Sequence, residues 1–400
     1  MHPILARLAP LCAVLIGLTP IRTFAAEENP DAQEWSGSGL AWADWSRLTG
    51  NWAGLRTSAE LAGLTFTGTH TLDWSAPLQG ALADRSTARG LFNLQATLAL
   101  PAHGATFTAQ YLAFHGRDAG ADLGALMSYS NIDSAPFSHW GELSYQQVFW
   151  DGQWRLKFGQ LDANTEFANV HAAAEFLHAS AGYSPTIVGF RTYPDPALSA
   201  NAFFRVNELV SAGLGVYGNT LRQTSTGLAR PFVIGEINFN HDAFGRIAVG
   251  FASELARLTR VDSTSQNGTG SFYMLAEQRL WRKNPVAKDD PRGVTLFEQL
   301  GTAAEAVSPI HRHLSVGLSG TGLLPGRDSD ICGLLCSVAT TSHADPTLTA
   351  PSETAIEGYY GLHLTGFLTM KADFQIIRHP GGDATRHDAV VGTLRFVTTF

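Results

Sequence analysis

Charged and polar residues recur at every second position in several short segments of this chain, a spacing that places them on one face of an extended strand. Segment 353–364 turns Glu357 and Tyr359 to one side, and segment 368–379 turns Lys371 and Asp373 in the same way. The full set selected on this basis is Glu142, Gln146, Arg155, Lys157, Arg205, Glu357, Tyr359, Lys371, Asp373 and Arg395. Groups of both signs can bind sugar hydroxyls if they line a watery lumen, although each could instead form a salt bridge that only fills the interior.

Patterns that would support catalysis or metal binding are weak. The chain has no Gly-x-Ser-x-Gly turn, no Cys-x-x-Cys pair and no phosphate-binding loop. A pair of carboxylates could cleave glycosides at a separation of about 5–9.5 Å, but sequence spacing does not establish such a distance. His311 and His313 share one strand face without a third ligand at metal spacing. We therefore expect no catalytic residues, no metal and no cofactor.

The strands that must position the polar set are clearest at the C-terminus. In residues 388–400, Phe400, Phe396 and Leu394 share one face, whereas Arg395 and Thr393 share the other. A strand that is apolar on one side and carries an arginine on the other suits a wall between lipid and water. The same pattern also fits the edge strand of a soluble sheet.

The first residues read as an export signal that occupies residues 1–26, with Arg7 before an apolar run and a small-residue exit at Ala25–Ala26. Its removal leaves 27 − 2 = 25 basic and 35 acidic residues, a net charge of −10 that disfavours a nucleic-acid partner.

Residues 27–49 are polar and contain Gly and Ser, and we expect them to form a flexible lead-in to the barrel. If the mature cysteines, Cys332 and Cys336, lie on one extended strand, they are about 13 Å apart, which is too far for a disulfide; either the segment is bent or the thiols stay free.

Sixteen strand segments follow a short helix predicted at Trp52–Ala62. They are 64–74, 90–100, 104–115, 139–150, 153–162, 198–207, 210–218, 230–240, 244–255, 270–281, 293–305, 310–321, 329–340, 353–364, 368–379 and 388–400. The connections alternate between short turns, such as Asp151-Gly152, and long loops at 75–89, 116–138, 163–197, 256–269 and 341–352. An even strand count with sorted loops is typical of bacterial outer-membrane barrels.

The 163–197 connection is the longest. Phe167, Val170, Ala174, Phe176 and Leu177 recur there at roughly helical spacing. A loop of this length is usually functional or disordered. We expect it to fold into the lumen and narrow it; a surface flap is the alternative.

The sequence therefore predicts an all-β protein, a 16-stranded antiparallel transmembrane β-barrel over residues 50–400 with a short N-terminal helix. The barrel would contact outer-membrane lipid. Two alternatives remain: a secreted soluble carbohydrate-binding β-sandwich, and an outer-membrane barrel enzyme.

Several blocks, in order, resemble the carbohydrate-selective outer-membrane porins typified by the glucose porins of Gram-negative bacteria. Leu48–Thr57 resembles an N-terminal Gly-Asp-Trp-Gly-Gly-Leu-Arg block, from which Asn51 and Ala53 depart. Trp154–Asn169, Gly320–Asp330 and Glu353–Thr365, the last continuing to Phe400, resemble later blocks. The resemblance implies passive diffusion of monosaccharides such as glucose through a narrow polar lumen. It also implies that the barrel assembly machinery recognises the last strand through Phe400.

Overall fold

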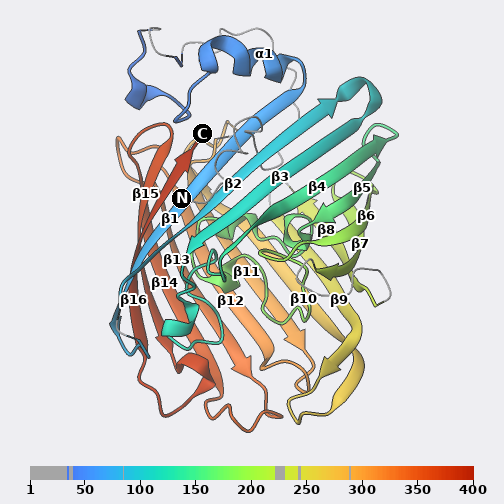
Figure 1. Ribbon diagram of the computed structural model, residues 1–400, viewed down its shortest axis with the longest axis vertical. Coiled ribbons are helices and arrows are strands. Elements are labelled where there is room, and N and C mark those ends of the chain that lie inside the picture. Colours follow the sequence, from blue (N-terminus) through green and yellow to red (C-terminus); the bar gives the residue numbers. More distant parts are fainter. Residues whose placement is uncertain (1–33, 36–38, 84, 221–229, 242–244, 288–289) are drawn as a thin grey trace, which may run out of the picture.

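The computed structural model describes residues 34–35, 39–83, 85–220, 230–241, 245–287 and 290–400 (Figure 1). The signal peptide predicted at residues 1–26 lies outside this part of the chain. Part of the 27–49 lead-in is described, and it lies against one end of the strands. There the Leu48 amide donates to the Thr399 carbonyl at 2.8 Å, and the Trp42 ring lies 4.9 Å from that of Phe367.

Sixteen strands are present among the described residues. They are β1 (Leu64–Gln79), β2 (Thr87–Leu100), β3 (Ala105–Gly116), β4 (Phe137–Phe149), β5 (Trp154–Leu161), β6 (Ala197–Arg205), β7 (Val210–Thr220), β8 (Phe232–His241), β9 (Gly245–Thr259), β10 (Ser265–Arg282), β11 (Gly293–Ala303), β12 (Ile310–Thr321), β13 (Ile331–Thr341), β14 (Ser352–His363), β15 (Leu368–Arg378) and β16 (Ala389–Thr399). Each pairs antiparallel with its sequence neighbours, and β1 pairs with β16 to close the barrel. The predicted barrel is confirmed, and the two-sheet sandwich is wrong.

The barrel wall has apolar side chains on its outer surface and charged side chains on its inner surface, the opposite of the usual distribution in a soluble protein. Large apolar side chains are exposed on the outside, including Trp74, Phe107, Trp140, Phe158, Leu214, Phe251, Phe272, Leu334 and Phe374. Charged side chains such as Asp73, Glu357 and Lys371 are almost fully buried on the inside. Because charge on a lipid-facing surface is costly, this alternation suits a strand with lipid on one side. Cys332 and Cys336 both lie on β13 as free thiols.

The longest connections, 117–136 and 162–196, lie at one end of the barrel (the long-loop end), together with 260–264, 304–309, 342–351 and 379–388. The other end (the short-turn end) carries 101–104, 150–153, 206–209, 322–330 and 364–367. The predicted strict sorting of loops by length is therefore wrong in part, because 322–330 is longer than 260–264 and 304–309. The prediction of a long loop at 256–269 is wrong. Pairs such as Ser265↔Thr259 and Asn267↔Arg257 extend the β9–β10 ladder, so that the connection between these strands is only 260–264. The predicted Asp151-Gly152 turn is confirmed, with left-handed φ angles of 52° and 80°.

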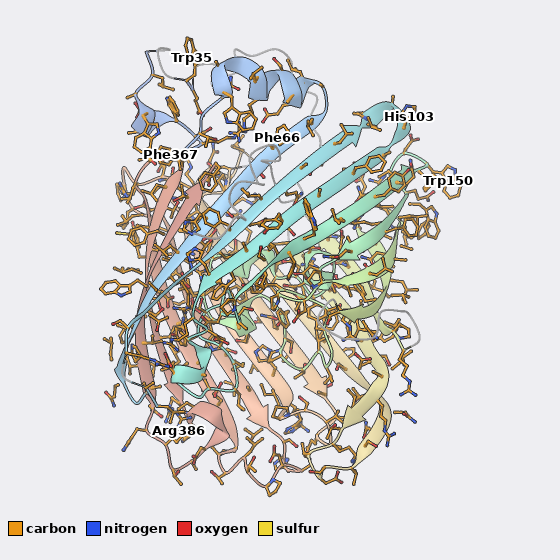
Figure 2. The ribbon with its side chains drawn as sticks, in the orientation of Figure 1. Trp35, Phe66, His103, Trp150, Phe367 and Arg386 are labelled. Atoms are coloured by element: carbon orange, nitrogen blue, oxygen red, sulfur yellow. The ribbon has the colours of Figure 1, made fainter. Side chains whose placement is uncertain are left out.

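A short helix, α1 (Leu55–Leu61), lies at the short-turn end, where the chain also finishes (Figure 1). It begins three residues later than predicted because Ala53 has φ 56° and ψ 38°, which is not helical. Gly63, with φ +88°, ends it as expected. Trp150, Phe66 and Phe367 lie at this end, and Arg386 lies at the opposite end (Figure 2).

Short 3-10 turns complete the architecture: Trp42–Asp44 (η3), Trp52–Gly54 (η4), Pro101–His103 (η5), Gly120–Asp122 (η6), Ala163–Thr165 (η7), His171–Ala173 (η8), Ala179–Ala181 (η9) and Pro380–Gly382 (η10). Among the described residues, no helix has the length and apolar character needed to cross a bilayer.

The seam between the first and last strands contains a buried ion pair. Arg395 of β16 donates to Asp73 of β1 through Nε at 2.6 Å and Nη2 at 2.8 Å. Removing one member of a buried pair leaves an uncompensated charge, which typically costs about 3–5 kcal/mol.

Arg395→Met should therefore lower the free energy of unfolding by about 3–5 kcal/mol. This is measured by denaturant titration in detergent micelles, followed by tryptophan fluorescence and by heat-modifiable gel migration. The double variant Asp73→Leu/Arg395→Met removes both charges and should recover part of the loss. A double variant that is as unstable as the single one would contradict this account of the seam.

Candidate functional site

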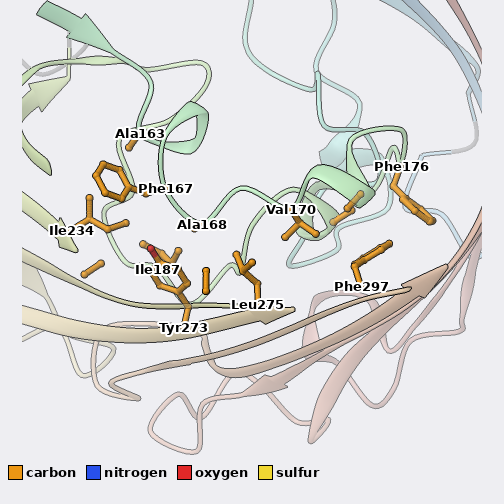
Figure 3. Close-up of a cluster of buried hydrophobic side chains, with 14 of the residues drawn as sticks. Ala163, Phe167, Ala168, Val170, Phe176, Ile187, Ile234, Tyr273, Leu275 and Phe297 are labelled. Atoms are coloured by element: carbon orange, nitrogen blue, oxygen red, sulfur yellow. The ribbon is translucent and has the colours of Figure 1, made fainter. Parts of the chain in front are cut away.

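The β5–β6 connection, residues 162–196, lies inside the barrel and is called the inward loop below (Figures 1 and 3). Phe167, Val170 and Phe176 are at most 1% exposed and pack with Tyr273 and Phe297 of the wall. This apolar contact confirms the predicted inward fold, and the surface-flap alternative is wrong. The spacing that suggested a helix instead gives the isolated turns η7, η8 and η9, with Ala174 exposed.

Carboxylates of the wall accept hydrogen bonds from the backbone of the inward loop. The contacts are Ala168 N to Glu236 Oε2 at 2.7 Å, Ala172 N to Glu277 Oε1 at 2.7 Å, Leu177 N to Glu357 Oε1 at 2.6 Å and His178 N to Glu357 Oε2 at 3.0 Å. Gln299 donates from the wall to the Ser180 and Ala181 carbonyls. Irregular backbone needs such partners wherever water is excluded.

The predicted residues of β4 and β5 form one cluster with the loop. Arg155 makes a bidentate pair with Glu166 of the inward loop, at 2.7 and 3.1 Å, and also donates to Gln146 at 3.1 Å. Lys157 lies 2.9 Å from Glu142 and 3.0 Å from Glu166. The four predicted side chains therefore share a single network with Glu166, and this network holds the start of the loop.

The predicted residues of β14, β15 and β16 form a second cluster. Lys371 pairs with Glu175 of the inward loop at 2.7 Å, and its Nζ lies 4.7 Å from the centre of the Tyr359 ring. Asp373 accepts from Gln375 at 2.9 Å. Glu357 and Arg395 belong to this face through the contacts given above. Arg205 stands apart, exposed at the short-turn end, where it donates to the Asp151 carbonyl at 2.7 Å.

A second connection, residues 117–136, also reaches the interior. Ser130 donates to Asp73 at 2.6 Å, and the Leu126 and Met127 amides donate to Glu353 at 2.7 and 3.1 Å. The sequence shows that this connection is long, but no local signal predicts that it would fold inward.

Asp122 of the same 117–136 connection forms two ion pairs. One is with Arg117 of that connection, and the other is with Arg85 of the β1–β2 connection. Burial alone would raise the pKa of Asp122, but the hydrogen bonds from Arg117 and then Arg85 lower that pKa below its usual value. Asp122 therefore remains ionised at neutral pH as part of this arginine cluster.

Two cavities flank the inward loop. The larger has a volume of about 1220 Å³, and its charged lining residues are Arg155, Glu166, Arg205, Glu208, Glu236, Arg246, Glu277, Arg279 and Arg282. The second has a volume of about 710 Å³, and Glu175, Asp328, Lys371 and Arg395 are its charged lining residues. Of the ten residues selected from the sequence, Arg155, Arg205, Lys371 and Arg395 line these cavities. The other six do not, and their contacts lie within the wall or with the loop.

Sequence reasoning missed a charged group on β8, β9 and β10. Arg246 donates to Glu277 at 2.9 Å, to Glu236 at 3.2 Å and to the Asn169 carbonyl of the inward loop at 2.7 Å. The same period of two that selected Glu357 would also have selected Glu236 and Glu277.

Glu357 provides a test of how the loop is held. Glu357→Ala would leave the buried Leu177 and His178 amides without an acceptor, at a cost of about 1–3 kcal/mol for each group. We expect a lower free energy of unfolding in denaturant titration and a less steady single-channel current. Glu357→Gln keeps one acceptor oxygen and should lose less.

Glu208→Ala is the control, because Glu208 is an exposed carboxylate in the short 206–209 connection. If Glu357→Ala unfolds at the same denaturant concentration as Glu208→Ala, the wall carboxylate does not hold the loop.

Comparison with known proteins agrees with this architecture. The family model described as "Carbohydrate-selective porin, OprB family" matches residues 83–400. Porin B of Pseudomonas aeruginosa is 26% identical over 163 residues, 36% of this chain, and the chain matches only 35% of that relative's length. The high-pH structure of Pseudomonas putida OprB superposes with a TM-score of 0.81 at 18% identity and covers 90% of this chain and 100% of its own.

The low-pH structure of the same Pseudomonas putida protein gives a TM-score of 0.61 at 17% identity, over 89% of this chain and 99% of its own. At these identities the two structures support the fold, and the family model supports the family. An outer-membrane location follows from the barrel and the family together. The chain belongs to the OprB family of carbohydrate-selective porins.

Proposed function

We propose that this protein admits carbohydrates, with monosaccharides such as glucose as its main solutes, by passive diffusion through a polar lumen that the inward loop narrows. The observation that carries the proposal is the larger cavity, whose wall and loop present charged groups of both signs. The volume of this cavity is about 1220 Å³. Its side chains can offer hydrogen bonds to sugar hydroxyls.

Passage requires binding that is weak and distributed over several sites, so that a sugar leaves as readily as it enters. Most charged groups of the lumen already have ionic partners, which limits how strongly any one of them can hold a neutral solute. Arg155 is partly accessible, with 24% of its side chain exposed, and its guanidinium lies 3.8 Å from the centre of the Phe203 ring. It can donate to a passing hydroxyl while it remains paired with Glu166. No energy source is needed, and the family and fold indicate a channel rather than an enzyme.

Arg155→Ala should raise ion conductance, because it removes bulk and charge from the edge of the larger cavity. It should also reduce discrimination between glucose and a neutral non-sugar of similar size, since charge-assisted hydrogen bonds are about twice as strong as neutral ones. Liposome swelling with both solutes, together with planar-bilayer conductance, measures the two effects.

Arg257→Ala is the control. Arg257 is exposed on β9, and neither Arg257 nor its hydrogen-bond acceptor Ser265 lines either cavity. If Arg155→Ala and Arg257→Ala give the same solute ratio as the unmodified protein, Arg155 only braces the wall and the sugar filter lies elsewhere.

We further propose that the barrel assembly machinery recognises the last strand through Phe400. The Phe400 amide donates to the Gly68 carbonyl at 2.9 Å, and its ring lies 6.3 Å from that of Phe92. This position at the β1–β16 seam supports a role in closing or recognising the strand.

Deletion of Phe400 should reduce the amount of inserted protein severalfold while leaving the conductance of the inserted molecules unchanged, because the residue lines neither cavity. Outer-membrane levels by immunoblot and single-channel recordings measure the two quantities. Phe396→Ala, on the same face of β16, is the control for loss of an aromatic ring. Normal insertion after the deletion would count against the proposal.

A further inference from the structure

Three potential metal ligands meet at the long-loop end of the barrel, away from both cavities. Glu305 lies in the β11–β12 connection, His311 lies near the start of β12, and His343 lies in the β13–β14 connection. One ligand atom from each lies within 4.8 Å of the other two. Glu305 Oε1 is 3.5 Å from His311 Nε2 and 3.3 Å from His343 Nδ1.

These separations are close to those of a tetrahedral site. A zinc ion with nitrogen and oxygen ligands about 2.0–2.1 Å away places neighbouring ligand atoms about 3.3 Å apart. The two histidines need to approach each other slightly. His343 can make this movement, since its side chain is 78% exposed.

The surrounding contacts orient the ligands. His311 is buried, and its Nδ1 lies 2.8 Å from the Thr341 carbonyl oxygen, which can only accept a hydrogen bond. In the neutral imidazole the proton is therefore on Nδ1, and the lone pair of Nε2 faces Glu305. A hydrogen bond from the far ring nitrogen to a carbonyl is the arrangement that metal-binding histidines usually have. The second carboxylate oxygen of Glu305 accepts from the His343 amide at 3.1 Å.

Hydrogen bonds to the backbone also hold the two connections together without the ligand side chains. Ser342 donates through Oγ to the Glu305 carbonyl at 2.8 Å and through its amide to the Pro309 carbonyl at 2.8 Å. The ligands thus come from a preformed contact between two loops, which lowers the conformational cost of binding.

We propose that Glu305, His311 and His343 form a binding site for Zn²⁺ or a similar divalent transition-metal ion on the extracellular face. The ion would join the β11–β12 and β13–β14 connections. Two imidazoles and a carboxylate match the preference of zinc, and water would complete the coordination from the open side. The site involves no residue of the sugar path.

The competing explanation is a simple ion pair between protonated His343 and Glu305. The two explanations differ in their response to metal. An ion pair strengthens as the pH falls and histidine is protonated, whereas zinc binding requires neutral imidazoles and weakens under the same conditions.

The test uses the full mature protein in detergent without a polyhistidine tag, with ZnCl₂ titrated by calorimetry at pH 7.5 and pH 5.5. We expect one Zn²⁺ per chain at pH 7.5 and weaker binding at pH 5.5. His343→Ala and Glu305→Gln should each weaken binding by at least about tenfold, the loss found even for outer-sphere contacts of metal sites. His387→Ala is the control, because His387 is exposed on the separate 379–388 connection at the same end.

Thermal unfolding provides a second readout, because an ion that binds only the folded state raises the unfolding temperature. Zn²⁺ should raise that temperature in the unmodified protein and in His387→Ala but not in His343→Ala. Heat-modifiable gel migration shows whether each variant is folded. The proposal is overturned if the unmodified protein binds no Zn²⁺ at pH 7.5, or if His343→Ala binds it as tightly as His387→Ala does.

Discussion

The hydrogen bond between a wall carboxylate and a loop amide is the interaction on which the interior depends. An irregular segment inside a barrel carries amides that no strand ladder satisfies, and leaving them unpaired where water is excluded is costly. Glu236, Glu277 and Glu357 supply carboxyl oxygens as acceptors from three separate strands, so the inward loop is fixed at several points along its length. An ionised acceptor such as Glu277, which pairs with Arg246, forms shorter and stronger hydrogen bonds than a neutral one.

This arrangement divides the charges of the lumen into two groups. Glu357 and Asp73 are completely buried and hold the loops or the seam. Glu175 and His171, with side chains 52% and 69% exposed, lie on the part of the inward loop that faces water. A solute therefore meets mainly the exposed edges of the network. Mutations of buried charges should act on stability first, and mutations at the edges should act on passage first.

The architecture was predictable because its signals are local. Alternation in 388–400 and the turn at Asp151-Gly152 identify strands and hairpins without any knowledge of distant partners, and an even strand count allows closure. The site was only partly predictable. Alternation turns Glu357 inward, but its partner Leu177 is 180 residues away in the chain, and no local pattern connects them. The apolar spacing around Phe167 was misread as helical because those side chains pack on a curved wall rather than on one helix face.

Sequence identity of only 18% with a structure that superposes at a TM-score of 0.81 is consistent with this division of roles. The outer face needs only apolar side chains of suitable size, and the ladder uses backbone groups that every residue except proline supplies. Much of the barrel can therefore change without loss of the fold. The anchors are less free, because replacing Glu357 or Glu236 must leave an acceptor at the same place. Solute preference can then change through exposed loop residues outside these pairs, such as Ala174, which lines the second cavity. Glu175 is less free to change, because it is the ionic partner of the buried Lys371.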